Sequence, residues 1–74
     1  MQSNEDLQKR LGARIRAIRL KRGLSQEAFA DACGIHRTHQ SLLERGRLNV
    51  KIQTLRLIAR ELKVTLSELF DGVA

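Results

Sequence analysis

The sequence is poor in the residues that small proteins use for covalent cross-links, rigid turns and aromatic cores. It contains no proline, tryptophan or tyrosine, two phenylalanines and one cysteine, Cys33. A single cysteine excludes an internal disulfide framework, and we expect it to be a small buried residue. No apolar run approaches the roughly 20 residues of a transmembrane helix, and no apolar stretch follows Met1 as in a signal peptide. We therefore expect a cytoplasmic protein with no membrane partner.

Acidic residues are also scarce relative to basic ones. Eight Asp and Glu stand against 14 Lys and Arg, which gives a net charge of +6. Residues 9–22 hold seven of the cations and no acid. Such an excess favours a polyanion as partner and is typical of proteins that bind nucleic acid. For the cations of residues 9–22, a purely solubilising role remains an open alternative.

The groups that carry catalysis or hold metal ions are missing or badly placed. The sequence has no paired-carboxylate, nucleophile–base or phosphate-loop arrangement, and 74 residues form a core too small for a pocket that excludes water. Cys33, His36 and His39 stand three residues apart, but a turn at Gly34 separates the cysteine from the histidines. We expect one domain, residues 1–74, that is not an enzyme and has no metal site or cofactor.

Residues 24–46 predict two short helices joined by a tight glycine turn. Ser25 can cap the first helix, over residues 26–33, and Gly34 can end it in the left-handed conformation. Its apolar face is expected to contain Ala28, Phe29, Ala32 and Cys33. The second helix starts at His36 to Thr38 and closes at Gly46. Leu43 marks its inner face, so that His39 and Gln40 face inward or lie along the flank. Its outer face then holds Arg37, Thr38, Ser41, Leu42 and Arg45.

Three further helices complete an all-α fold. The first runs over about residues 5–21, with Ser3 or Asn4 as cap. Its core stripe is Leu7, Leu11, Ile15 and Ile18. The fourth helix has core positions at helical intervals and Asn49 as a better cap than Lys51. These positions are Ile52, Leu55, Ile58, Ala59 and Leu62. The last helix starts with a capping box, Thr65 to Glu68.

Residues 24–46 resemble the helix-turn-helix of the phage repressor and Cro class of regulators, and the likeness extends over about residues 11–70. It is carried by Gly23-Leu24-Ser25-Gln26, Ala30, Gly34, Glu44-Arg45-Gly46 and Asn49. The resemblance implies a compact five-helix, lambda-repressor-like domain that binds double-stranded DNA and regulates transcription through its second and third helices. Within this class, Arg37-Thr38 and the short chain most resemble the controller proteins of restriction-modification systems.

The resemblance and the helix geometry together suggest a role for each residue of the site. DNA bases are expected to meet Arg37, Thr38, Ser41 and Leu42. DNA phosphates are expected to meet Gln26, His39, Arg45, Arg47, Asn49 and Lys51. The resemblance also implies a partly buried, structural ion pair between Arg19 and Glu44. The class has apolar residues where this chain has His39-Gln40. Either Gln40 bonds a backbone group at the edge of the core, or the helix is slightly rotated, so that His39 or Gln40 reaches a phosphate.

One short helix reads too few bases to single out a site in a genome, so members of this class pair two half-sites as symmetric dimers. A homodimer interface is expected from Leu66, Leu69, Phe70 and Val73. The alternative, in which Leu66 and Leu69 only close the core of the monomer, stays open. Two other functions also stay open: the antitoxin of a toxin-antitoxin pair, and a helix-turn-helix that contacts a protein partner.

Overall fold

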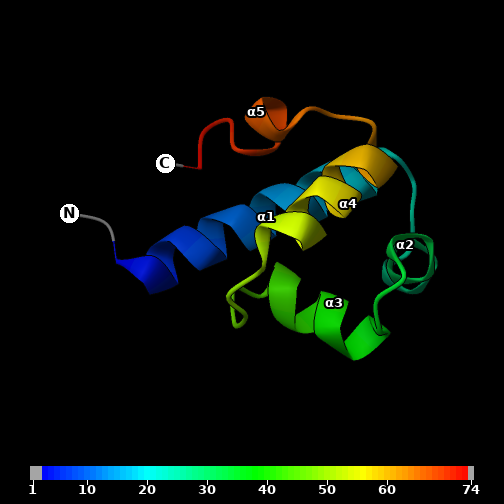
Figure 1. The fold of residues 1–74 in the computed structure, drawn as a ribbon, viewed down its shortest axis with the longest axis horizontal. Coiled ribbons are helices and arrows are strands. Elements are labelled where there is room, and N and C mark those ends of the chain that lie inside the picture. Colours follow the sequence, from blue (N-terminus) through cyan, green and yellow to red (C-terminus); the bar gives the residue numbers. More distant parts are fainter. Residues whose placement is uncertain (1–2, 74) are drawn as a thin grey trace.

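The computed structural model describes residues 3–73, and these residues form five α-helices and no strand (Figure 1). In chain order the helices are α1 (Asn4–Lys21), α2 (Gln26–Cys33), α3 (Arg37–Glu44), α4 (Ile52–Leu62) and α5 (Leu66–Leu69). α3 packs against α1 and α2, and α4 packs against α2 and α5. Figure 1 shows α3 and α5 at opposite edges of the molecule. The all-α, five-helix prediction is confirmed. Within this described part, no helix is long and apolar enough to cross a membrane.

Most helix boundaries follow from the capping residues that the sequence predicts. The hydroxyls of Ser3 and Ser25 each accept a hydrogen bond from the backbone N–H three residues on, at 3.1 and 3.0 Å. Gly34 ends α2 in the left-handed conformation, with φ of 71°. Thr65 and Glu68 form the reciprocal bonds of a capping box, and the backbone N–H of Thr65 holds the pKa of Glu68 below its usual value.

The starts of α3 and α4 differ from expectation. His36 is the cap of α3, because its Nδ1 accepts a hydrogen bond from the backbone N–H of Thr38 at 3.1 Å. Histidine is not among the preferred capping residues, so the sequence did not indicate this role. In α4 the cap position is Lys51, which makes no side-chain cap bond, so the prediction that Asn49 caps this helix is wrong.

One apolar cluster at the centre of the five helices forms the core. Its fully enclosed members include Ile15, Phe29, Ile58, Leu62 and Leu69, each with no exposed surface. The predicted filler role of Cys33 is confirmed, because its side chain lies in this cluster and burial raises the pKa of its thiol to about 11. Every helix of the fold contributes at least one residue to the cluster.

Two of the predicted apolar faces are partly wrong. In α2, Ala28 and Ala32 are exposed and Ala30 is buried beside Phe29. The buried residues of this helix are at positions 29, 30 and 33, and alanine is small enough for either face. In α4, Ile52 is 67% exposed, because it is the first residue of the helix and the core contacts begin at Leu55.

Three arginines, two on α1 and one directly after it, donate to backbone carbonyls of the C-terminal part of the chain. Arg14 donates to the carbonyl oxygen of Glu68 from Nε and Nη2, at 3.3 and 2.8 Å. Arg10 donates to the carbonyl of Val73 at 3.3 Å, and Arg22 to a carbonyl at the end of α4 at 3.4 Å. The cations of residues 9–22 therefore include structural donors, and they do not only solubilise the surface of α1.

Candidate nucleic-acid interface

α3 crosses α1 at a point where there is no room for a side chain. A Cβ atom placed on Gly12 would lie well inside contact distance of the carbonyl oxygens of Leu43 and Glu44. These oxygens belong to the backbone of α3, so they cannot rotate away as a side chain would. Gly12 therefore sets how closely the third helix approaches the first.

A buried ion pair fixes the C-terminal end of α3. The guanidinium of Arg19 donates to both carboxylate oxygens of Glu44, from Nε at 2.8 Å and from Nη2 at 3.0 Å. Its Nη1 also donates to the carbonyl of Leu24 at 2.7 Å. Arg19 and Glu44 are each only 6% exposed, so the structural pair that the resemblance implied is present. A two-point bond of this kind orients α3 as well as holding it.

Two glutamines add donors to the same carboxylate. Gln40 donates from Nε2 to Glu44 at 2.6 Å, and Gln26 donates from the first residue of α2 at 3.3 Å. Gln40 is completely buried, and its own Oε1 has no hydrogen-bond partner among the described residues. Neither alternative for Gln40 is correct, since it bonds a side chain and faces the core. α1, α2 and α3 therefore each supply a donor to Glu44.

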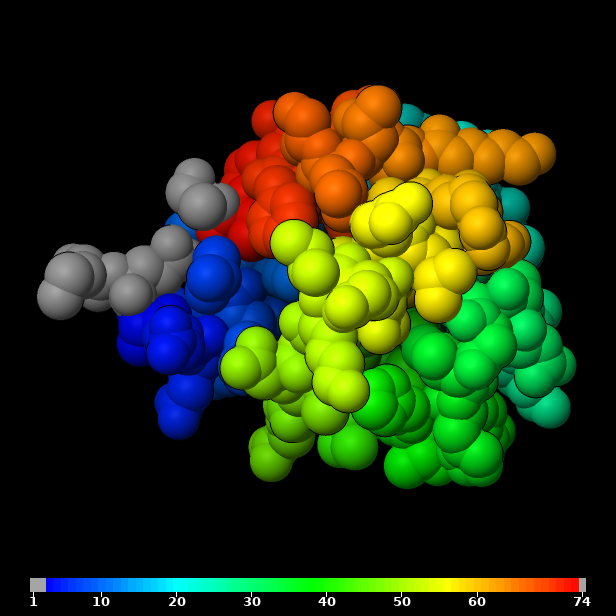
Figure 2. Space-filling model, in the orientation of Figure 1, coloured from blue at the N-terminus to red at the C-terminus, as the bar shows by residue number. Residues whose placement is uncertain are grey.

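The predicted base-contacting residues lie together on the side of α3 away from the core. Arg37 and Thr38 are exposed at the start of the helix, and Ser41 and Leu42 are half-buried one turn later. The buried side of the helix consists of Gln40, Leu43 and Glu44. α3 runs along the lower edge of the molecule, where Figure 2 shows its surface uncovered by other elements. Its first turn is thus free to enter a groove of a duplex.

The predicted phosphate contacts fall into an exposed group and one exception. His39 on α3 and the residues that follow the helix are exposed, namely Arg45, Arg47, Asn49 and Lys51. Arg45 also donates from Nε to the carbonyl of Ser41 at 3.4 Å. Gln26 is the exception, because it is half-buried and one of its amide hydrogens is used by Glu44.

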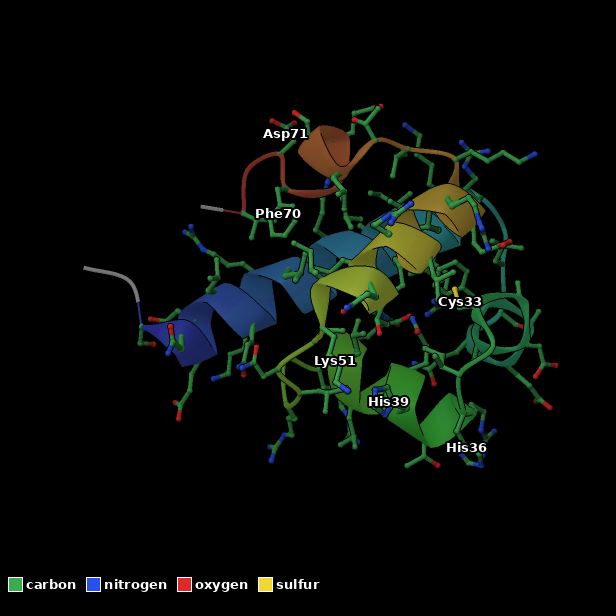
Figure 3. The ribbon with its side chains drawn as sticks, viewed as in Figure 1. Cys33, His36, His39, Lys51, Phe70 and Asp71 are labelled. Carbon is green, nitrogen blue, oxygen red and sulfur yellow. The ribbon has the colours of Figure 1, made fainter. Side chains whose placement is uncertain are left out.

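The histidines and the cysteine do not form a metal site. Figure 3 shows Cys33, the last residue of α2, away from His36 at the start of α3 and from His39 on that helix. Across residues 3–73 no group of three His, Cys, Asp or Glu side chains is arranged to hold a metal ion.

Two of the four predicted interface residues belong to the core. Leu69 and Val73 are 0% and 1% exposed, so the prediction that they supply dimer surface is wrong for this monomer. For Leu69 the alternative is confirmed, because this side chain belongs to the core cluster of the monomer. Leu66 remains 36% exposed, and Phe70 is half-buried against the core. The sequence did not indicate a groove of about 550 Å³ whose lining includes Leu57 of α4 and Leu66 of α5.

The helix-turn-helix family matches residues 15–69 of the chain. The chain is 39% identical to the control protein C.MunI of a Mycoplasma species, over 92% of this chain and 93% of that protein. Among solved structures it is similar to the restriction-modification controller protein C.AhdI of Aeromonas hydrophila, with 37% identity and a TM-score of 0.83 over 88% of this chain and 97% of that one.

A third similar structure is the restriction-modification controller protein C.Esp1396I, solved as a tetramer with its natural 35 base-pair operator. Its identity is 33% and its TM-score 0.81, over 90% of this chain and 88% of that one. A regulator from Vibrio cholerae is longer: the chain spans 39% of it, with 27% identity and a TM-score of 0.86 over 95% of this chain. Together with the exposed first turn of α3, these matches show that the chain belongs to the helix-turn-helix family.

Proposed function

We propose that this protein is a transcriptional regulator that binds a (pseudo)palindromic operator as a homodimer, with α3 in the major groove of double-stranded DNA. The observation that carries the proposal is the exposed first turn of α3 on a helix whose other side is fixed by Glu44. C.Esp1396I, which is 33% identical to this chain, was solved as a tetramer with its operator. The protein acts by binding and not by catalysis.

Arg37 and Thr38 read the bases. A guanidinium at the first turn of a recognition helix suits the O6 and N7 acceptors of guanine, and threonine offers a hydroxyl or a methyl group. Ser41 and Leu42 lie one turn later, over the next bases or their sugars. Leu42 can make only an apolar contact, for example with the methyl group of thymine.

Gln26 connects the DNA backbone to the buried network. Its Nε2 carries two hydrogens, and Glu44 accepts only one of them. The other hydrogen is available to a phosphate at the start of α2, where the free amides and the helix dipole also favour an anion. His39, Arg45, Arg47, Asn49 and Lys51 line the backbone of the same half-site. The charged members Arg45, Arg47 and Lys51 supply most of the salt-dependent affinity.

Dimerisation uses apolar surface near α5. Leu66 and Phe70 are the members of the predicted interface that remain accessible, and Ile52 and Leu57 of α4 extend this surface. The chain acts as one domain, in the cytoplasm, where a bacterial operator is accessible. A role as controller of a restriction-modification system belongs to the same proposal, supported by the 39% identity to C.MunI and 37% to C.AhdI.

The test is a selection of bound duplexes from a randomised DNA pool at about 150 mM salt, where non-specific binding is weak. The expected result is a two-fold symmetric motif with half-sites about 10 base pairs apart. A parallel selection with Arg37→Ala should relax one base position in each half-site. If no sequence is enriched by the wild-type protein, the proposal is wrong, and a protein partner such as a toxin becomes the better explanation of the exposed helix.

A further inference from the structure

A groove of about 610 Å³ runs between the N-terminal half of α1 and the end of α3. Figure 2 shows the two walls side by side, the blue start of α1 and the yellow-green segment that follows α3. Its polar and apolar lining comes from Glu5, Gln8, Lys9, Leu42, Arg45 and Arg47. Leu42 lies on the outer face of α3 and Arg45 directly follows the helix, so the groove continues the surface proposed to bind DNA.

The chain backbone brings the cations of this groove together. Gly46 has φ of 73°, and a Cβ there would lie 2.7 Å from the backbone nitrogen and from Cγ of Lys9. α1 therefore rests directly on Gly46, between Arg45 and Arg47. Lys9, Arg45 and Arg47, from two segments far apart in the sequence, therefore line the same groove, and all three are exposed.

None of these cations is neutralised by an ion pair. Ion pairs between described residues join Arg19 to Glu44 and Arg60 to Glu61, and neither pair includes Lys9, Arg45 or Arg47. Glu5 precedes Lys9 by four residues, the spacing at which helical ion pairs form, but the two charged groups are not within 4.0 Å. The groove thus carries three cations against one acid, which suits a chain of phosphates.

We propose that this groove binds the phosphate backbone of the operator strand that leaves the C-terminal end of α3, and that Lys9 adds a contact from α1. The inference rests on the proposed function and extends its footprint beyond the helix-turn-helix and its following loop. A contact between Lys9 and a phosphate does not distinguish one base sequence from another. It strengthens binding to every duplex that α3 engages.

The experiment measures operator affinity against salt for the wild-type protein, Lys9→Gln and Lys21→Gln. Glutamine keeps the Cβ and Cγ atoms of Lys9 that pack on Gly46 and removes only the charge. Loss of one phosphate contact should reduce the slope of log affinity against log salt by about 0.9 for each bound protomer. The affinity ratio of wild type to variant should then fall about 3.5-fold per protomer between 50 and 200 mM salt. Lys21 lies on the same helix about 18 Å away, so its variant should keep the wild-type slope.

A further variant tests whether negative charge in the groove weakens DNA binding, as the inference requires. Glu5→Gln removes the acid at the rim of the groove and should tighten binding to operator and random duplexes alike. Phosphate ethylation interference should lose one position per half-site in Lys9→Gln and none in Lys21→Gln. Unchanged slopes and interference in Lys9→Gln, with normal binding by the wild type, would overturn this inference alone. If the wild-type protein bound no preferred duplex, the proposed function would be overturned as well.

Discussion

Replacing Gly12 with alanine should destabilise the protein, although alanine is the better helix former. In the interior of an exposed helix the change would stabilise by about 1 kcal/mol. Here the new Cβ would lie 2.6 Å from the carbonyl oxygen of Glu44 and closer still to that of Leu43. Overpacking costs about 1–3 kcal/mol, and a backbone that cannot rotate places this site at the upper end. The expected net loss is about 2 kcal/mol.

Thermal unfolding followed by circular dichroism measures this loss. In a domain of this size 1 kcal/mol corresponds to roughly 4–8 °C, so the Tm of Gly12→Ala should fall by roughly 8–16 °C. The matched control is Ala13→Gly, at an exposed neighbouring position, which should lose about 1 kcal/mol through helix propensity alone. A Gly12→Ala protein as stable as the wild type, or more stable, would refute the close approach of α1 to α3.

Three further outcomes are expected. Arg37→Ala should weaken the free energy of binding to the selected operator by about 1–3 kcal/mol and relax one base position. Lys51→Ala should instead weaken binding to all duplexes equally and lower the slope of log affinity against log salt by about one. Equal losses on specific and random DNA for both variants would contradict these roles. Glu44→Gln should lower the free energy of unfolding, measured in urea, by about 3–5 kcal/mol, because the buried guanidinium of Arg19 loses its counter-charge. A loss below about 1 kcal/mol would contradict the burial of this ion pair. The free energy of unfolding should also fall as pH rises from 9.0 to about 11, where the unfolded thiol of Cys33 ionises and the folded one does not. The same decline in Cys33→Ala would show that other groups cause it.

The sequence predicted the ends of helices well wherever a capping residue determines them. Ser25, Gly34 and Thr65 act through local hydrogen bonds or a local backbone conformation, so their roles depend little on the rest of the fold. The pair of Arg19 and Glu44 is different. It joins residues 25 apart, and only the likeness to a known family indicated it before the structure showed it.

Features that depend on packing could not be predicted from the sequence in the same way. Periodicity could not decide which alanines of α2 are buried, because a methyl group fits both the core and the surface. It also could not show that Leu69 and Val73 are buried whereas Leu66 is exposed. The hydrogen-bond partner of Gln40 could not be predicted, because a buried amide needs one specific partner. The structure shows that this partner is the carboxylate of Glu44.

The polar network around Glu44 has a consequence for how this protein can change its target. All the bonds that orient α3 arise from its inner side, and none of them involves Arg37 or Thr38 side chains. Mutations at these two exposed positions, which we propose read the bases, should therefore leave the scaffold intact. The proposed function then implies that changes at Arg37 and Thr38 alter the operator preference with little loss of folding stability, so that a gene duplicate acquires a separate target in a few steps.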